Sequence, residues 1–418
     1  MTVGMVEDRG FRRRLITTVT VVVALTAGYS GPASAAVAVD VQSKQWYLDA
    51  MQAEEIWKTS TGEGITVAVI DSGVNPSTSS LKGQVLKGKD LAEIEGDETD
   101  DYRGHGTTMA ELIAGTGQGG GLKGLAPGAK IIPFRTSDTE LQNEQKVNAF
   151  DMEEAIKAAA DSDAKIINAS FGNEYYSSAV REAVKYAQEK GKLFFTAAGN
   201  DAKKGNPESY PAMYPEAVAV AATGADGQVA DYSQHGDFVD LAAPGNDIPR
   251  WCDDSFTRYC DGDGGTSAAT ALASASAALI WSAHPDWTAN QVLRVMFESA
   301  GRGEDWKKGT VSNYLGHGLV RPAAHINSGI GKPGDPSISP LTNEKVGGAS
   351  GSSATPEASA PASSQAPQDK PDFPAPVAGS STESSDDSSL PGWVIGAIAA
   401  AVVIGGGAFA VVRKRRSA

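Results

Sequence analysis

Short apolar runs alternate with longer helical patterns through most of this chain. Residues 64–70 (GITVAVI) are rich in β-branched residues and lead directly to Asp71, and a helical pattern covers 150–161. A repeated strand–helix order favours an α/β fold in which helices cover both faces of a mostly parallel, twisted sheet. The other expected strands span 130–134, 164–169, 192–197 and 217–221, and the other expected helices span 106–115, 177–190 and 267–284.

Three short stretches carry side chains suited to catalysis. Asp71 follows the first strand, His105 lies between two glycines at the start of a helix, and Ser267 begins a long helix after Gly264-Gly265-Thr266. A serine hydroxyl needs an adjacent imidazole to take its proton, and the imidazole needs a carboxylate to orient it. Because parallel sheets bind ligands beyond the carboxyl ends of their strands, these residues are candidates for one site.

Each stretch has an ordinary interpretation when it is taken alone. A carboxylate at a strand end is often a cap or a loop anchor, and serines in glycine-rich loops are common. The order Asp, His, Ser along one chain is more informative than any single stretch. The histidines that compete with His105 are His235, His284, His317 and His325.

The three stretches and five further blocks resemble the subtilisin-like serine proteases, the subtilases. The resemblance covers residues 62–320 and implies the subtilisin-like α/β fold. It implies that Ser267 is the nucleophile, that His105 is the general base and acid, and that Asp71 orients the imidazole. The matching blocks are VAVIDSGV, GHGTTMAELIAG, GLAPGAKIIPFR, INASFG, FTAAGN, YPAMYPEAVAVAA, DYSQHGDFVDLAAPG and GGTSAA.

The same resemblance assigns roles to residues that the sequence alone would leave as turns or strand ends. It implies that Asn200 supplies the side-chain donor of an oxyanion hole, together with the backbone N–H of Ser267. It also implies that Ser170, Phe171 and Gly172 line the primary specificity pocket and pair with substrate backbone. Without the resemblance, a turn would be the preferred interpretation of Asn200.

Two positions depart from the family pattern. Ala271 stands where subtilases usually have proline, and Glu111 places a carboxylate where the helix after the histidine usually has glycine. The acidic stretch 97–101 (DETDD) is better explained as a solvated loop than as a calcium site. We expect neither a metal nor any other cofactor.

Cys252 and Cys260 are the two cysteines of the chain, and they lie eight residues apart in a loop rich in Asp and Gly. The N-terminus reads as an export signal, and an exported chain favours a disulfide between them. A metal site would need more ligands than this stretch contains.

The ends of the chain predict export and membrane anchoring. Residues 1–35 contain three consecutive arginines, an apolar stretch and Ala33-Ser34-Ala35, which is typical of a cleaved signal peptide. Near the C-terminus, 20 uncharged and mostly apolar residues are long enough to span a membrane, and the basic residues that follow predict a cytoplasmic end. The expected organisation is a signal peptide (1–35), an N-terminal extension packed on the body (36–61), a catalytic domain (62–330), a disordered Ser/Pro/Ala-rich linker (331–391), a transmembrane helix (392–412) and a basic tail (413–418).

This organisation resembles the mycosins, membrane-anchored proteases of type VII secretion systems. It implies a serine endopeptidase at the cell membrane, with its catalytic domain outside, acting on protein or peptide substrates through an acyl-enzyme. The alternatives are a structural stabiliser of a membrane secretion complex, with catalysis dispensable, and a general cell-surface protease. A formal net charge of −15 argues against a nucleic-acid partner, because phosphate backbones would be repelled.

Overall fold

The computed structural model describes Met1 and residues 41–346, except 147–150, 263, 304–305 and 308. The expected transmembrane helix and basic tail lie outside the described residues, as does the expected signal peptide apart from Met1. Of the expected linker, the structure describes only 331–346. Among the described residues, no helix combines the length and apolar character needed to cross a membrane.

Seven parallel strands form the central sheet, in the order β2-β3-β1-β4-β5-β6-β7. The chain leaves β1 toward one side to build β2 and β3 and then crosses back to build β4 to β7. The strand order therefore reverses between β1 and β4, and ligand sites in open parallel sheets lie beyond the carboxyl ends at such a point. The strands are β1 Thr66–Asp71, β2 Lys89–Asp90, β3 Lys130–Arg135, β4 Ile166–Ala169, β5 Leu193–Ala197, β6 Val218–Thr223 and β7 Leu241–Pro244.

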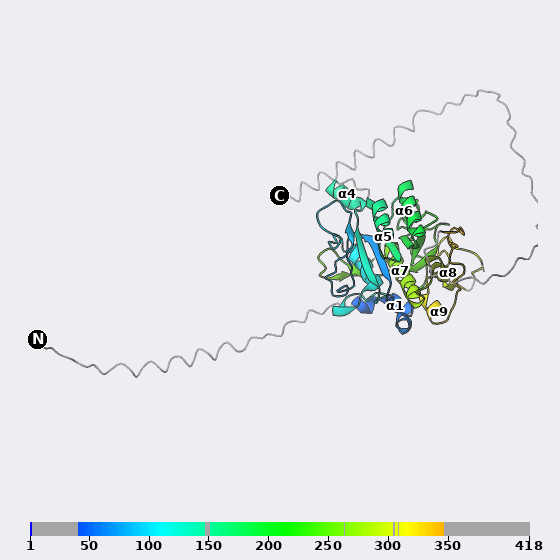
Figure 1. Ribbon diagram of the computed structural model, residues 1–418, viewed down its shortest axis with the longest axis horizontal. Coiled ribbons are helices and arrows are strands. Elements are labelled where there is room, and N and C mark those ends of the chain that lie inside the picture. The colour runs from blue at the N-terminus through cyan, green and yellow to red at the C-terminus, as the bar shows by residue number, and fades with distance from the viewer. Residues whose placement is uncertain (2–40, 147–150, 263, 304–305, 308, 347–418) are drawn as a thin grey trace, which may run out of the picture. The chain divides into compact units, whose positions relative to one another are not determined.

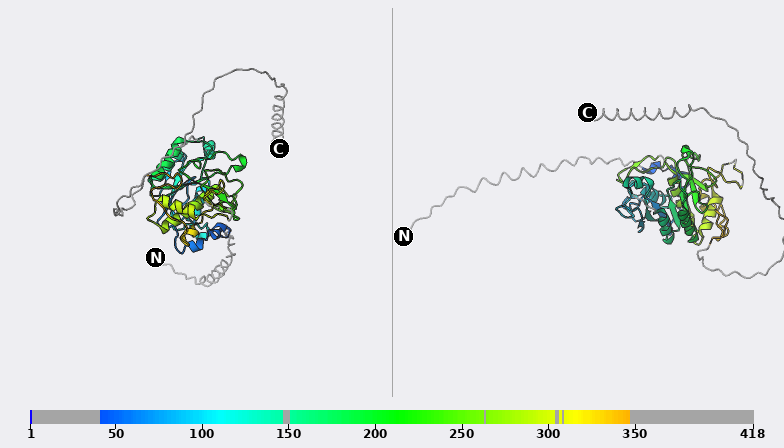
Figure 2. Two further views of the ribbon diagram at one scale, coloured as in Figure 1. Left: turned by 90° about the vertical axis from the view of Figure 1, so that its right-hand side faces the viewer. Right: turned by 90° about the horizontal axis from the view of Figure 1, so that it is seen from above.

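Helices cover both faces of this sheet, as the views in Figures 1 and 2 show. Successive side chains of a strand point to opposite faces, and β1 illustrates the result. Val67 and Val69 join a core with α3 (His105–Ala114), α7 (Thr266–Ala283) and α8 (Ala289–Ser299), while Ala68 and Ile70 join a second core with α5 (Asp151–Asp161) and α6 (Ser178–Glu189). The expected α/β architecture is confirmed.

The expected strands and helices from residue 64 to 284 are all present, with ends shifted by a few residues at most. Strands β2 and β7 and helix α8 were not expected from the sequence, nor were the other short elements of the described chain. These are α1 (Trp46–Ala50), α2 (Ala53–Ile56), α4 (Thr139–Gln145), α9 (Pro322–Ile326), a hairpin of β8 (Arg250–Trp251) and β9 (Tyr259–Cys260), and 3-10 turns at Val41–Lys44, Gln118–Gly120 and Ala202–Lys204.

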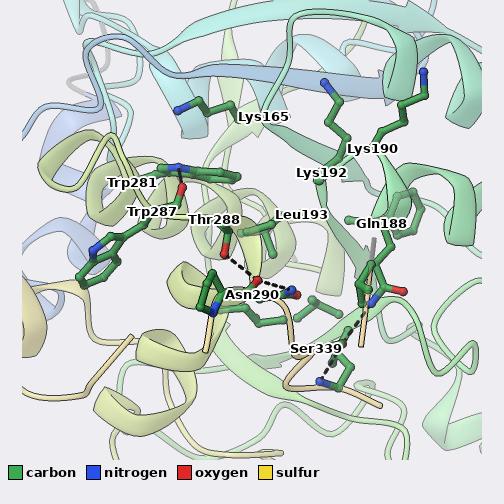
Figure 3. A pocket seen from close by; sticks show the side chains of 18 of the residues that line it. Lys165, Gln188, Lys190, Lys192, Leu193, Trp281, Trp287, Thr288, Asn290 and Ser339 are labelled. Carbon is green, nitrogen blue, oxygen red and sulfur yellow. Dashed lines mark hydrogen bonds between the residues drawn. The ribbon is translucent and has the colours of Figure 1, made fainter. Parts of the chain in front are cut away.

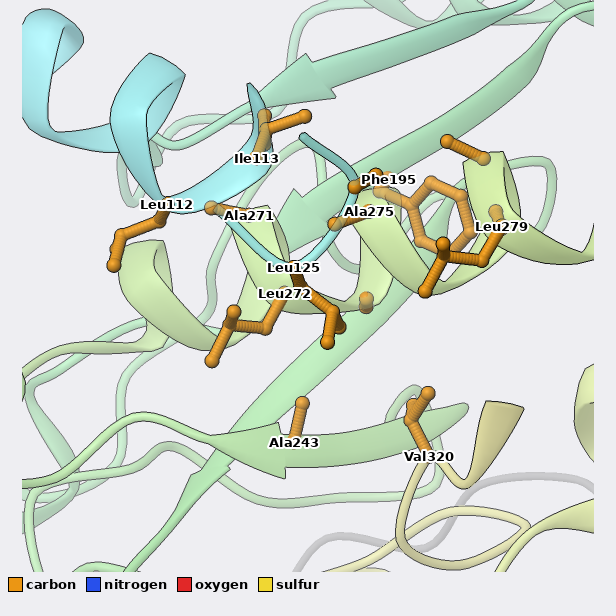
Figure 4. Packing of buried hydrophobic residues seen from close by; sticks show 14 of the residues in the cluster. Leu112, Ile113, Leu125, Phe195, Ala243, Ala271, Leu272, Ala275, Leu279 and Val320 are labelled. Carbon is orange, nitrogen blue, oxygen red and sulfur yellow. The ribbon is translucent and has the colours of Figure 1, made fainter. Parts of the chain in front are cut away.

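Helix α7 runs through the middle of the larger core (Figure 4). Its sequence is mostly alanine with serine, and Ala271 and Ala275 are fully buried. Small side chains let the helix lie close to the sheet and to α3, and Leu272 and Leu279 fill the remaining space. Because Ser267 is in the first turn of this buried helix, its position is fixed by the core of the protein.

Residues 41–57 pack against the body of the protein through α1 and α2. Tyr47 and Ile56 have no exposed surface, and the Trp57 indole donates a hydrogen bond to the Leu125 carbonyl at 2.8 Å. At the other end, residues 334–346, which the sequence analysis included in the linker, are hydrogen-bonded to α8. The Arg294 guanidinium donates to the Ile338 carbonyl at 2.9 Å.

Candidate active site

The side chains of Asp71 and His105 are in hydrogen-bond contact. The Asp71 Oδ1 atom lies 2.7 Å from His105 Nδ1 and also accepts the backbone N–H of Ser72 at 2.8 Å. Asp71 is buried at 7% exposure, whereas the imidazole is partly exposed. This geometry orients the imidazole so that its Nε2 edge is free for a second partner.

Opposing influences act on the pKa of His105. Burial by itself would lower this pKa, but the negative charge of Asp71 and the hydrogen bond that its carboxylate accepts from the imidazole act in the other direction. The result is a pKa above the ordinary value for histidine. A neighbouring carboxylate thus stabilises the imidazolium form, as a general base requires.

The start of α3 brings His105 to Asp71. Gly106 follows the histidine, and a Cβ atom there would lie 2.2 Å from the Gly73 carbonyl oxygen, so only glycine permits this approach of helix to strand. The buried Asp101 carboxylate accepts the backbone N–H groups of Gly104 and Thr107 at 2.8 Å and thereby caps the helix. Asp101 therefore differs from the solvated loop residue that the sequence analysis expected.

Ser267 lies at the same edge of the sheet as Asp71. The β1–β4 register pairs Ile70 with Ala169, so Asp71 and Ser170 follow at neighbouring strand ends. Ser267 Oγ donates a hydrogen bond to the Ser170 carbonyl oxygen at 3.1 Å. No hydrogen bond joins Ser267 to His105 in the described part of the chain, and catalytic hydrogen bonds are often formed only when substrate is present.

Asn200 follows β5 and presents its amide to the same region. Its Oδ1 atom accepts both the backbone N–H and the hydroxyl of Thr266 at 2.9 Å. This fixes the amide so that Nδ2, which donates to no described group, remains available. Ser267 N–H lies in the first turn of α7, where N–H groups lack an acceptor within the helix. Two donors are therefore available for a developing oxyanion.

Replacing Asn200 with alanine is expected to lower kcat by about 10²–10³-fold with little change in KM. The loss falls on kcat because an oxyanion donor acts mainly in the transition state. The expected size of the loss is the one known for removal of the corresponding donor in subtilisin. Steady-state kinetics with a peptide substrate would test it. Asn206→Ala, which changes an amide of the neighbouring turn that bonds to His235, is the matched control. Equal losses in the two variants would contradict a role for the Asn200 amide.

A pocket of about 160 Å³ opens beside Ser267 and Asn200. Ser170, Phe171 and Gly172, which the sequence analysis assigned to the specificity pocket, all line it. Further residues, which were not expected here, also line it: Asn173, Glu174, Asp201, Pro207, Glu208, Ser209 and Gln234. The pocket and the two oxyanion donors therefore share one edge of the sheet.

A larger cavity of about 750 Å³ lies away from these residues (Figure 3). Its lining includes Lys165 and Lys192, which precede β4 and β5, so it lies at the amino ends of the strands. Lys192 donates to the carbonyl oxygens of Ser162 and Ala164, and Thr288 donates to that of Pro336. These side chains hold neighbouring segments together, and none of the expected catalytic residues lines this cavity.

Cys252 and Cys260 form the expected disulfide, which closes the β8–β9 hairpin. The hairpin packs on α3: Tyr259 OH donates to the Glu111 carboxylate at 2.8 Å, and the Tyr259 ring stacks on Trp251 at 3.8 Å. Glu111 is fully buried and also accepts the Thr78 hydroxyl at 2.8 Å. The family departure at Glu111 is thus built into a packed, hydrogen-bonded contact. Among the described residues, no group of three His, Cys, Asp or Glu side chains could hold a metal ion.

Comparison with known proteins gives consistent matches. The model of the subtilase family matches residues 62–318. Thermitase from Thermoactinomyces vulgaris is 33% identical over 280 residues, covering 65% of this chain and 95% of thermitase.

Among solved structures, MycP1 from Mycobacterium smegmatis is similar with a TM-score of 0.59 and 26% identity, covering 72% of this chain and 88% of that one. The MycP3 protease from the type VII (ESX-3) secretion system has a TM-score of 0.56 and 30% identity, covering 67% and 87%. The span that the subtilase model matches includes Asp71, His105, Asn200 and Ser267.

Proposed function

This chain belongs to the subtilase family. We propose that it is a membrane-anchored endopeptidase that works in type VII secretion. As a subtilase it is a serine protease, and it resembles the mycosins in structure. The proposal adds the residues that perform the reaction, the anchoring and the secretion role.

The reaction begins with Ser267. Its Oγ leaves the Ser170 carbonyl, passes its proton to His105 Nε2 and attacks the scissile carbonyl carbon. The negative charge that forms on the carbonyl oxygen is stabilised by Asn200 Nδ2 and the Ser267 N–H. His105 then gives the proton to the leaving amine, and an acyl-enzyme remains on Ser267. A water molecule, deprotonated by His105, attacks the ester carbonyl, and the proton returns to Ser267 Oγ as the acid product leaves.

The observation that carries this mechanism is the 2.7 Å contact between His105 Nδ1 and the buried Asp71 carboxylate at the end of β1. The end of the neighbouring strand β4 leads to Ser170, whose carbonyl oxygen accepts the Ser267 hydroxyl. A buried Asp–His pair occurs in structural ion pairs too, but those lack a serine at a helix N-terminus and free oxyanion donors beside them. Together these groups can perform acyl transfer.

The anchoring and the secretion role rest on other support. The apolar stretch 392–412 is long enough to span a membrane once. The basic residues that follow it are typical of a cytoplasmic end. Two solved relatives, MycP1 from the ESX-1 and MycP3 from the ESX-3 type VII secretion system, are similar over about two thirds of this chain. No observation on the described residues favours the purely structural alternative.

Labelling with a fluorophosphonate probe tests the proposed chemistry directly. We expect the purified full-length protein to be labelled and the Ser267→Ala variant to remain unlabelled, because only an activated serine attacks the probe. Ser255→Ala, on an exposed loop, is the control and should label like the unmodified protein. A folded protein that takes no label, or a Ser267→Ala variant that still does, would overturn the proposal.

A further inference from the structure

Three carboxylates border the pocket beside Ser267. Glu174, Asp201 and Glu208 belong to its lining, and we call them the acidic rim. Asn173 and Tyr210 exchange two backbone hydrogen bonds, of 3.0 and 2.8 Å, which bring the segments of Glu174 and Glu208 side by side. The acidic rim is therefore a product of the fold.

The position of the pocket tells which part of a substrate would enter it. The scissile carbonyl must lie within reach of both Ser267 Oγ and Asn200 Nδ2, and both residues line the pocket. The side chain nearest to that carbonyl, on the residue that forms the acyl-enzyme, then projects into the pocket. The acidic rim thus faces the residue on the amino side of the cleaved bond.

Most of the negative charge of the rim is uncompensated. Lys204 forms an ion pair with Asp201 at 2.8 Å and also interacts electrostatically with Glu174, so one cation serves two of the three carboxylates. Glu174 and Glu208 are exposed and form no ion pair with any residue that the structure describes, and Glu208 is held only by the Tyr210 hydroxyl at 3.1 Å. Lys203, the other cation of this turn, is paired with Asp231. A substrate side chain would therefore meet a net negative potential.

Size alone does not select the side chain. A space of about 160 Å³ is comparable to cavities that hold a benzene-sized group, so a long aliphatic or an aromatic side chain would fit. Gly199 has a φ of +110°, and a Cβ there would lie 1.9 Å from Gln234 Oε1, so glycine lets these two lining residues lie close together. Among side chains of this size, the negative charge of the acidic rim decides which one binds best.

We propose that the acidic rim makes this protease select lysine or arginine on the amino side of the cleaved bond. A long basic side chain would lay its apolar stem along Phe171 and Gly172 and place its cation toward Glu174 and Glu208, since all four residues line the pocket. The proposal rests on the proposed function of the same site, since it assumes that Ser267 is the nucleophile. It adds the substrate class, which the family resemblance leaves open.

Binding of uncleaved peptides to the full-length Ser267→Ala variant tests the selectivity without requiring catalysis. The probes are fluorescein-labelled hexapeptides Ala-Ala-Ala-X-Ala-Ala with X as Lys, Met or Glu, followed by fluorescence anisotropy. Two exposed charge pairs predict a Kd about tenfold lower for Lys than for Met, and weaker binding still for Glu. Since the carboxylates are exposed, the Lys preference should shrink between 50 and 500 mM salt.

Variants of the rim identify the source of the preference. Adding Glu174→Gln and Glu208→Gln should bring the Lys and Met peptides to within about twofold of each other, with the Met peptide unchanged as the internal check on folding. Glu182→Gln, an exposed change on α6 outside the pocket, should leave the tenfold ratio intact.

Equal or tighter binding of the Met peptide, a ratio that survives both rim substitutions, or no measurable binding of the Lys peptide would overturn the selectivity. Failure of the proposed function is read separately, from an unmutated protein that takes no fluorophosphonate label.

Discussion

Asp71→Asn is expected to lower kcat by about 10⁴-fold without unfolding the protein. His105 can accept the Ser267 proton on Nε2 only when Nδ1 carries the other proton, and the Asp71 carboxylate enforces that tautomer through the 2.7 Å contact. An asparagine can present its N–H to Nδ1 instead and hold the unproductive tautomer. The expected size of the loss is the one known for Ser-His-Asp proteases, subtilisin among them. Steady-state kinetics on a peptide ester or anilide would measure it.

The pH profile adds a second readout for the same variant. Activity needs neutral His105, so kcat/KM rises with pH through the pKa of this residue. Asp71 raises that pKa, and without its charge the acid limb of the profile should move to lower pH. Asp138→Asn is the matched control, because Asp138 is a more distant contributor and is paired with Arg103. An unshifted acid limb in Asp71→Asn, or a 10⁴-fold loss in Asp138→Asn, would contradict the assigned role.

The sequence predicted the elements that hold the proposed catalytic residues, because those elements have strong local signals. The run at 64–70 is continuously apolar and β-branched, and α7 combines a glycine-rich start with 18 helix-forming or small residues. Strand β7 escaped prediction because Leu241–Pro244 is only four residues long and mostly alanine and proline. Its place in the sheet comes from pairing with β6, a contact that no local pattern encodes.

The site shows the same division between local and long-range information. The resemblance identified Asp71, His105, Ser267 and Asn200 because each lies in a short motif. The acidic rim was not predicted, since Glu174 and Glu208 come together only through the pairing of Asn173 with Tyr210. Side chains that set substrate preference sit on loops joined by tertiary contacts, and such contacts cannot be read from one sequence.

Glu111 is the clearest case of a residue whose surroundings the sequence could not supply. The departure from the family pattern was visible, but Thr78 and Tyr259 are 33 and 148 residues away along the chain. In the folded protein these two hydroxyls donate to a carboxylate with no exposed surface. No ion pair neutralises it among the described residues, so burial raises the pKa of Glu111 to about 7, against an ordinary value of 4.5.

Glu111→Gln is therefore expected to stabilise the protein by about 3 kcal/mol at pH 8 and hardly at all at pH 4.5. Between these values the folded wild type keeps a proton that the unfolded chain releases, so the free energy of unfolding of the wild type falls as pH rises from 4.5 to about 7. At about 1.4 kcal/mol per pKa unit, the raised pKa costs about 3 kcal/mol once Glu111 is ionised. A glutamine resembles the protonated carboxyl in shape and never pays this cost.

Urea unfolding of the full-length protein with its disulfide intact, at pH 4.5, 6 and 8, would measure the difference between Glu111→Gln and wild type. The difference is the useful quantity, because burial also raises the pKa of Asp240 to about 7 and alters both proteins alike. Glu54→Gln, an exposed change on α2, should give a small difference at every pH. A gain for Glu111→Gln that does not grow with pH, or a wild type that is the more stable protein at pH 8, would show that the carboxylate is accommodated in its charged form. Because Glu111 lies in α3, the helix that begins at His105, that result would also mean that ionising Glu111 does not strain the helix that positions the proposed catalytic histidine.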